Sequence, residues 1–243
     1  METDNYEVWH LEIDPYVQGN LLYSGYRRLQ STDGNVSSLV TGGSNGYREG
    51  KGEKAQYRTI SAFLNFNRTH VLMTDRFNHC LRFVNRDTNV SSTFAGNCKR
   101  MGQKDGNFTT AEFYEPMGIT RYGSKIFVSD FRTRLIRMIL LDTEYVFTFS
   151  DDSRLVWPRS LTFDSTGSRL FVVVNHGILE FNTETQACSS LTNLTEGFMD
   201  GDLANSQWEY PQQISLVDRN TLAVIDSGNI RLRLIDLEQN QVI

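Results

Sequence analysis

Three pairs of Asp and Arg residues are the first candidates for chemistry in this sequence, because every pair has the same seven-residue spacing. The pairs are Asp75 with Arg82, Asp130 with Arg137, and Asp226 with Arg233. Three converging carboxylates could hold a cation, provided that their oxygens come within about 2.5 Å of it. A residue that recurs with a repeat usually serves the repeat itself, so we interpret the pairs as structural. Each Asp is expected to accept N–H groups in the tight connection that follows it, and each Arg to reach back to its Asp.

The three cysteines predict one disulfide. Their spacing fits no zinc-binding motif, and three are too few for a disulfide-rich scaffold. Cys80 lies in a predicted strand, and Cys98 lies just past the next strand of the same hairpin, which turns near Asp87 and Thr88. That arrangement brings the two within the Cα separation of about 5.5 Å that a disulfide needs; the alternative is two half-buried free thiols. Cys188 has no evident partner, and we expect it to be a buried packing residue or to pair outside this sequence.

Five Asn-x-Ser/Thr sequons are candidate N-glycosylation sites: Asn35, Asn67, Asn89, Asn107 and Asn193. About three would arise by chance in a chain so rich in Asn, Ser and Thr, so their number alone is weak support. All five fall in predicted exposed loops, where a glycan interferes with no packing. Together with the predicted disulfide, they favour an extracellular or cell-surface location.

The chemistry-bearing residues recur because the chain is built from a repeat. Three segments begin with an acidic residue and Gly, followed by a small residue five positions after the Gly, an aromatic residue after seven, and Pro or Ile after ten. The segments are 49–60, 105–116 and 200–211. Each is followed by an Asp–Arg pair, and apolar runs of strand length with no helical period flank the Asp.

Two weaker copies, around residues 21–29 and 157–175, lack the Asp–Arg pair because the turn between their second and third strands is shorter. The chain thus contains five units of four short strands each. Their expected boundaries are 1–43, 44–97, 98–150, 151–193 and 194–243. A four-stranded unit of this kind is typical of the blade of a β-propeller, so the predicted fold is all-β, with a single propeller domain over 1–243.

The repeat resembles the NHL repeat, strongly in three units and weakly in two, over nearly the whole chain. The resemblance is carried by residues 73–82 of the second unit and, in the third, by Asp105–Gly106, Ala111, Phe113, Pro116–Ile119, Ile126–Asp130 and Ile136–Arg137. It implies a propeller of four-stranded antiparallel blades. NHL propellers commonly have six blades, whereas five can be counted here, so we expect five and keep six as the alternative.

The resemblance also implies an enzyme as one alternative, since similar propellers include amidating lyases and lactonase-like enzymes with a metal at the central channel. The lyases take histidine ligands from several blades, and the histidines here are His10, His70, His79 and His176. At most His10 and His176 are expected near the axis, fewer than the three protein ligands of a catalytic zinc site. The sequence also has no Gly-x-Ser-x-Gly elbow and no phosphate-binding loop. We therefore expect no catalysis, no metal and no cofactor.

An intracellular RNA-binding NHL domain is the second alternative. Such domains bind RNA on a positively charged face, whereas the net charge here is −5 and the pI about 5.4. Basic residues cluster only modestly, at Arg27–Arg28 and Lys99–Arg100. No stretch is long enough for a membrane-spanning helix, and the first four residues are acidic and polar, unlike a secretory signal. We expect a domain excised from a longer chain, without membrane insertion and without nucleic acid as a partner.

The favoured function is a binding or scaffold module that recognises another macromolecule, a protein or a glycan, through loops on one face. Candidate partner-binding residues lie in the connections that do not repeat. They are Tyr47, Arg48, Lys99, Arg100, Met101, Phe198 and Met199. Tyr, Phe, Met and Arg are enriched in interface cores. The alternative is that each of these side chains packs against its own blade.

Overall fold

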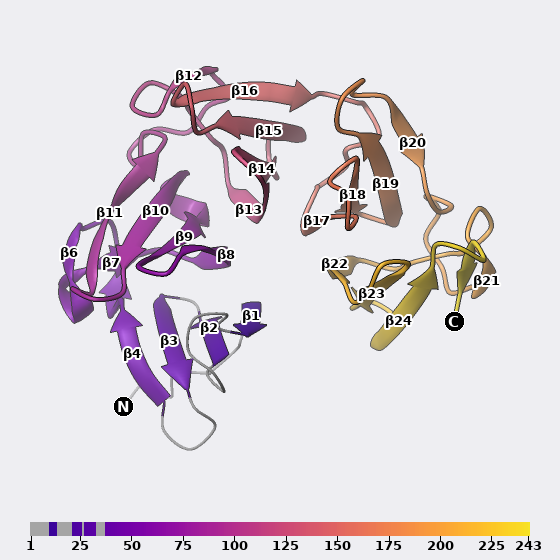
Figure 1. The fold of residues 1–243 in the computed structure, drawn as a ribbon, viewed down its shortest axis with the longest axis horizontal. Coiled ribbons are helices and arrows are strands. Elements are labelled where there is room, and N and C mark those ends of the chain that lie inside the picture. Colours follow the sequence, from indigo (N-terminus) through magenta and orange to yellow (C-terminus); the bar gives the residue numbers. More distant parts are fainter. Residues whose placement is uncertain (1–9, 14–20, 26, 33–36) are drawn as a thin grey trace. The chain divides into compact units, whose positions relative to one another are not determined.

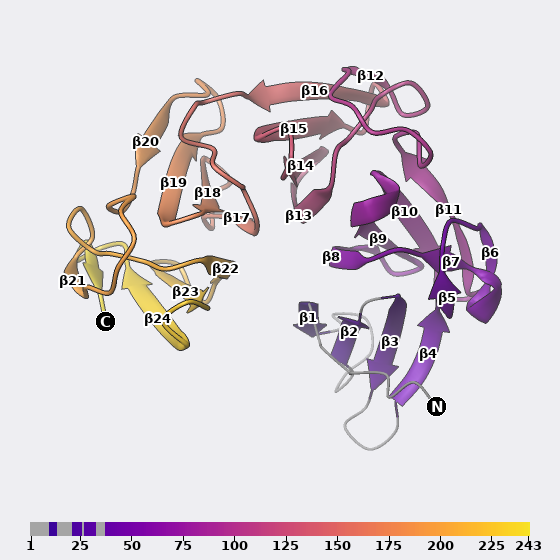
Figure 2. The same cartoon turned by 180° about the vertical axis from the view of Figure 1, so that it is seen from behind.

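The chain folds almost entirely into strands and turns (Figure 1). The computed structural model describes residues 10–13, 21–25, 27–32 and 37–243. Five antiparallel sheets follow one another along these residues, and in each the four principal strands lie side by side in chain order, as Figures 1 and 2 show. The helical segments that are described are single turns of 3₁₀ helix, η1 (Gly52–Lys54) and η2 (Arg76–Asn78). The all-β, five-bladed propeller architecture predicted from the repeat is confirmed.

Each blade is one sheet of four principal strands. Blade 1 contains β1 (His10–Ile13), β2 (Leu21–Gly25), β3 (Arg28–Thr32) and β4 (Ser37–Thr41). Blade 2 contains β8 (Ile60–Asn67), β9 (His70–Asp75), β10 (Cys80–Asn85) and β11 (Val90–Ala95). Blade 3 contains β13 (Pro116–Tyr122), β14 (Lys125–Asp130), β15 (Leu135–Leu140) and β16 (Tyr145–Ser150). Blade 4 contains β17 (Leu161–Phe163), β18 (Arg169–Val174), β19 (Gly177–Asn182) and β20 (Cys188–Ser190), and blade 5 contains β22 (Pro211–Leu216), β23 (Thr221–Asp226), β24 (Arg231–Asp236) and β25 (Gln241–Val242).

The acidic–Gly step of the repeat adds a fifth strand that the sequence pattern does not predict. The added strands are β6 (Gly50–Lys51) in blade 2, β12 (Gly106–Asn107) in blade 3 and β21 (Gly201–Asp202) in blade 5. Each pairs antiparallel with the fourth strand of its own blade. The edge of the fourth strand is thereby covered, which removes a row of unpaired backbone groups. A further short pair, β5 (Ser44–Asn45) with β7 (Gln56–Tyr57), is parallel and lies in the connection that leads into blade 2.

The turn lengths explain why the repeat of blade 4 lacks the Asp–Arg pair. Four residues join the second and third strands in blades 2, 3 and 5, at 76–79, 131–134 and 227–230. Only two residues join them in blade 4, at 175–176, whereas the corresponding turn of blade 1 includes a residue outside the described ones. The shorter turn leaves no room for the side-chain network, described below, that the Asp begins in the longer ones.

The chain divides into two compact units, residues 1–119 with 144–146 and residues 120–143 with 147–243. In the first unit, apolar side chains of blades 1 and 2 form a core that includes Leu29, Tyr57 and Phe63. The second unit has two cores. One is formed by blades 3 and 4 and includes Phe127, Phe163 and Phe181. The other is formed by blades 4 and 5 and includes Phe171, Trp208 and Ile235. The single domain over 1–243, with the five blade boundaries given above, stays a prediction.

Candidate functional site

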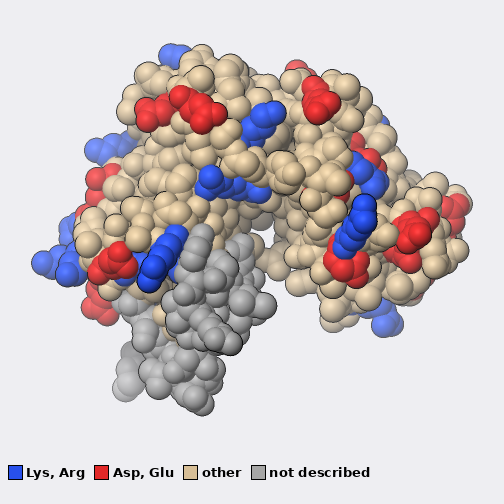
Figure 3. Space-filling view, in the orientation of Figure 1, with Lys and Arg blue, Asp and Glu red and all other residues tan. Residues whose placement is uncertain are grey.

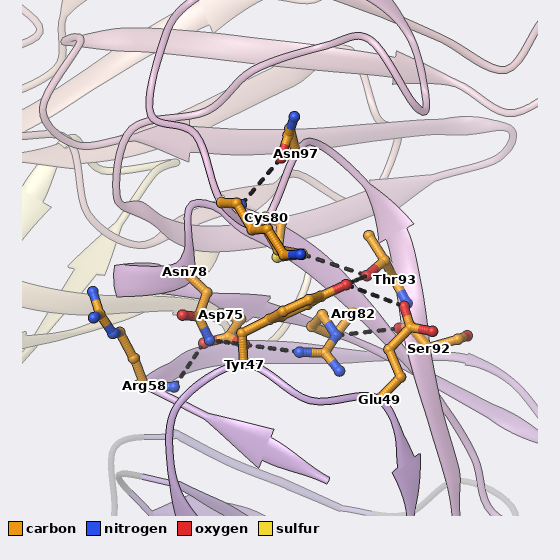
Figure 4. The surroundings of a disulfide bond; sticks show 12 residues. Tyr47, Glu49, Arg58, Asp75, Asn78, Cys80, Arg82, Ser92, Thr93 and Asn97 are labelled. Atoms are coloured by element: carbon orange, nitrogen blue, oxygen red, sulfur yellow. Dashed lines mark hydrogen bonds and ion pairs between the residues drawn. A yellow bond between two sulfur atoms is a disulfide. The ribbon is translucent and has the colours of Figure 1, made fainter.

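The Asp–Arg pair of blade 2 lies in the interior, where it holds the incoming connection to the sheet (Figure 4). Arg82 Nη1 donates to Asp75 Oδ2 at 3.1 Å, and both side chains are fully buried. Asp75 also accepts bonds from the backbone N–H of Arg58 at 3.0 Å and from Asn78 Nδ2 at 2.8 Å. Arg82 donates further to the carbonyl oxygens of Gln56 and residue 48. The pair therefore fixes residues 48–58 rather than facing a ligand.

Blades 3 and 5 use their pairs in the same place. Arg233 donates to Asp226 at 2.8 Å and to two carbonyl oxygens of the preceding connection. Asp226 accepts the backbone N–H of Glu209 at 2.9 Å. In blade 3, Arg137 and Asp130 are buried together at 3.6 Å. In blades 2 and 5 the backbone donor thus comes from the connection before the blade, and not from the turn after the Asp as the sequence suggests.

Two of the candidate partner-binding aromatics cover these buried arginines. The Arg82 guanidinium lies 5.0 Å from the ring centroids of both Tyr47 and Tyr57. The Arg233 guanidinium lies 5.1 Å from Phe198 and 3.8 Å from Trp208. One aromatic of each sandwich belongs to the repeat and is fully buried, and the other comes from a non-repeating loop. Tyr47 is half-buried and bonded to Thr93, so it is mainly a packing residue, whereas Phe198 keeps 48% of its surface exposed.

Burial dominates the electrostatics of Asp75. Desolvation raises the pKa of its carboxyl to about 6, and the hydrogen bond from Asn78 and the charge of Arg82 offset only part of this effect. The carboxylate of Asp75 is therefore held at an energetic cost near neutral pH, and its partners offset only part of that cost.

The predicted disulfide between Cys80 and Cys98 is present, with a Cα–Cα separation of 4.9 Å (Figure 4). It joins the first residue of β10 to the segment that follows β11, beside the register shift between Leu81 and Arg82. Cys188 is half-buried, and desolvation raises the pKa of its thiol to about 12. A thiol that stays protonated at neutral pH is a poor nucleophile, so Cys188 is a packing residue in this structure.

The end of each blade at which its first strand begins is called here the top end, and the other the bottom end. In an antiparallel four-stranded blade, the top end also carries the turn between the second and third strands and the start of the connection to the next blade. In the connections into blades 2, 3 and 5, the chain then runs along the fourth strand of the next blade as far as its bottom end before it returns to the first strand. All seven candidate partner-binding residues belong to such connections. Of these, Met101, Phe198 and Met199 are the exposed apolar ones, and Arg48 and Arg100 are exposed basic ones. Arg100 pairs with Glu112 at 3.0 Å, and Lys99 lies 6.0 Å from the Tyr47 ring.

Sequence reasoning missed a second set of aromatics at the top end. Trp157 and Tyr210 are 36% and 38% exposed, and Phe77 is exposed to a similar extent. Trp157 and Tyr210 directly precede Pro158 and Pro211, which begin the path into the first strands. The signal for these residues in the sequence is an aromatic residue directly before a proline. The repeat pattern made use of the proline alone, as a landmark.

The bottom ends of the blades carry polar turns, together with two exposed tyrosines, Tyr122 at the end of β13 and Tyr145 at the start of β16. A side-chain oxygen of Asn or Asp accepts the N–H groups of the following turn at Asn67, Asn85, Asp164, Asn182, Asp218 and Asp236. Three sequons also lie there, namely Asn67 at the end of β8, Asn89 between β10 and β11, and Asn107 opposite the start of β16. Asn193 follows β20 at the top end, and Asn35 lies outside the described residues.

The histidines lie in separate surroundings. His10 packs against Phe63, His70 bonds within the Asn67 turn, His79 contacts Tyr114, and His176 contacts Tyr210. Within the described ranges, no group of three or more His, Cys, Asp or Glu side chains is arranged to hold a metal ion. The same residues form no helix long and apolar enough to cross a membrane.

Five antiparallel blades, three of which contain a buried Asp–Arg pair, define a β-propeller in which these repeat residues serve the scaffold. No family model matches the chain, and no curated protein matches it in sequence. Among solved structures, it is similar to a chain of the nidogen/laminin complex, with a TM-score of 0.71 and 14% identity, covering 98% of this chain and 79% of that one.

Two auxiliary nutrient-binding proteins of Bacteroides are also similar. The one from Bacteroides thetaiotaomicron has a TM-score of 0.69 and 15% identity, and the one from Bacteroides ovatus has 0.71 and 12%. The match covers 97% of this chain but only 56% of either nutrient-binding protein, so the chain spans about half of their length. At these identities the likeness shows a shared propeller fold.

Proposed function

We propose that this chain is a non-catalytic, NHL-type propeller module that recognises another protein through the top ends of its blades. The observation that carries the proposal is that more aromatic and methionine side chains are exposed in the turns and connections at the top ends of the blades than at the bottom ends. The former are Phe77 and Met101 in the first compact unit and Trp157, Phe198, Met199 and Tyr210 in the second, and the latter are Tyr122 and Tyr145. These residue types, with Arg, supply most of the binding energy in protein interfaces. The turns at the bottom ends are instead dominated by Asn and Asp side chains that accept backbone N–H groups.

A binding role fits the use of the repeat residues better than catalysis does. The groups most able to do chemistry, such as Asp75 and Arg82, are fully buried and paired, so a substrate has no access to them. RNA binding is disfavoured because the net charge is −5 and, on the face drawn in Figure 3, basic and acidic side chains of the described residues are interspersed. The names of the similar structures point the same way, since they include a protein complex and nutrient-binding proteins.

The binding end can be tested with photo-crosslinking side chains placed at two exposed apolar positions. Met199 lies in the connection that leaves blade 4 at its top end, and Val217, which is 60% exposed, follows β22 at the bottom end. In an extract of the tissue that makes the protein, we expect Met199 to crosslink one discrete partner at least about tenfold more efficiently than Val217, because interface residues lie against the partner. Equal crosslinking from both positions, or crosslinking from Val217 alone, would contradict the proposal.

An extracellular or cell-surface location is the second part of the proposal. Disulfides persist in oxidising compartments, and the structure contains one. Asn67 and Asn107 are exposed, and in both the side-chain oxygen accepts the hydroxyl of the sequon Thr, at 3.1 and 2.9 Å. Asn89 differs, because its sequon residue Ser91 is buried and accepts a bond from Arg82.

For protein made in the secretory pathway, we expect N-glycans on Asn67 and Asn107 and lower occupancy at Asn89. The reason is that a glycan at either exposed turn interferes with no packing, whereas Asn89 is half-buried beside the Arg82 network. Peptide mapping after enzymatic deglycosylation in heavy-oxygen water measures the occupancy of each site. Secreted protein with neither Asn67 nor Asn107 modified would refute the expected location of the glycans.

A further inference from the structure

We infer that Trp157 and Tyr210, with Phe131 and His176 beside them, form the anchor of the binding face, and that the anchor takes an acidic protein segment with an apolar side chain. This inference rests on the proposed function, because it names the contact residues and the partner chemistry of the same top end. All four residues belong to the second compact unit.

The four rings, called here the aromatic row, form two contacting pairs that are carried by three blades. Phe131, in the turn between β14 and β15, stacks on Trp157 with ring centroids 6.3 Å apart and an interplanar angle of 22°. His176, in the turn between β18 and β19, lies 5.2 Å from the Tyr210 ring. Backbone bonds tie the two pairs together.

In those backbone bonds, the N–H of Asn175 donates to the carbonyl of Val156 at 2.9 Å, and the N–H of Tyr210 donates to the carbonyl of Asn175 at 3.1 Å. The residues that carry the rings are thus held by the scaffold, while more than a third of the Trp157 and Tyr210 surfaces remains exposed. Because these aromatic rings are already held in place and partly exposed, they lose little conformational entropy when a partner binds.

The backbone at both aromatics is strained. Trp157 has φ of 52° and Tyr210 has φ of 48°, in the left-handed region that a bulky residue rarely adopts. Glycine would occupy either position without the steric cost of a Cβ. Positive φ by itself recurs at other turn residues, including Ile230, so what marks Trp157 and Tyr210 is the combination of this conformation with a large and partly exposed aromatic ring.

A third residue in the equivalent position shows what a structural role looks like there. Glu115 precedes Pro116 and has φ of 61°, yet it is only 5% exposed and pairs with Arg76 at 2.7 Å. The buried ion pair accounts for the presence of Glu115. Trp157 and Tyr210 instead direct a large part of their rings to solvent, which a purely structural role does not require.

The partner chemistry follows from the cations around the row. The guanidiniums of Arg132 and Arg159 lie 5.7 and 5.8 Å from the Phe131 ring, and of the cations near this ring Arg132 and Arg134 are exposed whereas Arg159 is buried. At the other end of the row, the Glu196 carboxylate lies 3.8 Å from His176 Nε2, so we place the acidic group of the partner at the Phe131 end. Guanidiniums favour carboxylates, which they bind with charge-assisted hydrogen bonds, and the aromatic faces favour an apolar side chain. Trp, Tyr and Arg together are the residue types that dominate interface energetics.

The first test uses thermal stability to decide whether the rings of Trp157 and Tyr210 are needed for packing. In Trp157→Gly/Tyr210→Gly, we expect the thermal unfolding midpoint to stay unchanged or to rise by roughly 2–4 °C, because the strain is relieved. The matched control is Glu115→Gly, which relieves the same backbone strain but removes a buried ion pair, so its midpoint is expected to fall. A fall in the double variant as large as that of the control would show that the rings are packing residues and would overturn the inference.

The second test measures recognition with a phage-displayed library of random peptides selected on the immobilised wild-type protein. We expect enrichment of peptides with Asp or Glu beside Trp, Tyr, Phe or Leu, and a loss of affinity of at least about tenfold in Trp157→Gly/Tyr210→Gly. Val217→Ser, at the bottom end of blade 5, serves as the control and should keep most of the affinity. Enriched peptides that lack acidic residues, or that bind the double variant equally well, overturn the inference.

These outcomes are distinct from failure of the proposed function. If Met199 crosslinks a partner whose binding does not change in the double variant, then the top end is the binding face and the aromatic row is not its anchor. If the protein binds sugars on a glycan array and the double variant does not, the row binds a glycan, and the assignment of an acidic protein segment is wrong.

Discussion

Arg82→Met is expected to lower the free energy of unfolding by about 3–5 kcal/mol, because it leaves the Asp75 carboxylate buried without its cation. Arg82 is fully buried, so its loss also removes the hydrogen bonds to the carbonyl oxygens of residues 48 and 56. It also removes the guanidinium that contacts the rings of Tyr47 and Tyr57. Methionine is chosen since it replaces much of the volume without a charge. Urea unfolding at pH 7 measures the change, and the loss should release the whole connection into blade 2.

The pH dependence of this loss follows from the raised pKa of Asp75. Its folded-state pKa, about 6, lies above the ordinary value of 3.8, so the folded state takes up the proton first as the pH falls. The energetic cost of the charged Asp75 is therefore fully present above about pH 6 and disappears as the pH falls to about 4. Because Asp75 without Arg82 has an even higher pKa, the deficit of Arg82→Met should shrink between pH 7 and pH 4. A deficit that is constant or larger at pH 4 would contradict this account.

The matched control is an ion pair at the surface. Arg169 and Glu180 are joined at 2.6 Å, but their side chains are 35% and 23% exposed. Solvent screens such a pair and hydrates either residue when the other is removed, so Arg169→Met should cost no more than about 1 kcal/mol. Similar losses for Arg169→Met and Arg82→Met would mean that burial is not the source of the effect.

Removing the disulfide is the second large change. Cys80 and Cys98 are 18 positions apart. A disulfide that closes a loop of that size lowers the conformational entropy of the unfolded chain, which stabilises the folded state by about 3 kcal/mol. Cys80→Ser/Cys98→Ser should therefore lose about that amount in urea unfolding, and wild-type protein kept in reductant should lose a similar amount.

Cys188→Ser provides the control for cysteine replacement itself. Cys188 is half-buried and outside the disulfide, so its substitution should cost less than about 1 kcal/mol. If the reduced wild type is as stable as the oxidised protein while Cys80→Ser/Cys98→Ser is destabilised, the serine hydroxyls rather than the lost bond would be responsible.

The five-bladed architecture, the Asp–Arg pairs and the disulfide could be predicted from the sequence because each depends on the spacing of residues that are close together along the chain. In the repeat, an Asp ends one apolar strand and an Arg seven residues later lies in the next apolar strand. The spacing from Asp75 to Arg82 therefore marks two adjacent strands wherever it occurs. The Cys80–Cys98 pair follows in the same way, since a hairpin register relates nearby residues.

Other features were decided by groups that are distant along the chain. The backbone N–H that donates a hydrogen bond to Asp75 belongs to Arg58, seventeen positions earlier, and no local pattern identifies that donor. The fifth strands arise in the same way, because Gly50 pairs with Ser91 of a strand that the chain forms much later.

The candidate binding residues show the limit most clearly. Tyr47 and Phe198 stand at equivalent positions in the sequence, yet only packing around the buried arginines leaves Phe198 exposed and Tyr47 half-buried. Trp157 and Tyr210 are ordinary residues before proline in the sequence, and their exposure and positive φ come from the fold. Spacing along the chain determined which residues build the blades, because strand pairing is periodic. Tertiary packing alone determined which side chains remain for a partner, because exposure depends on neighbours that the local sequence does not contain.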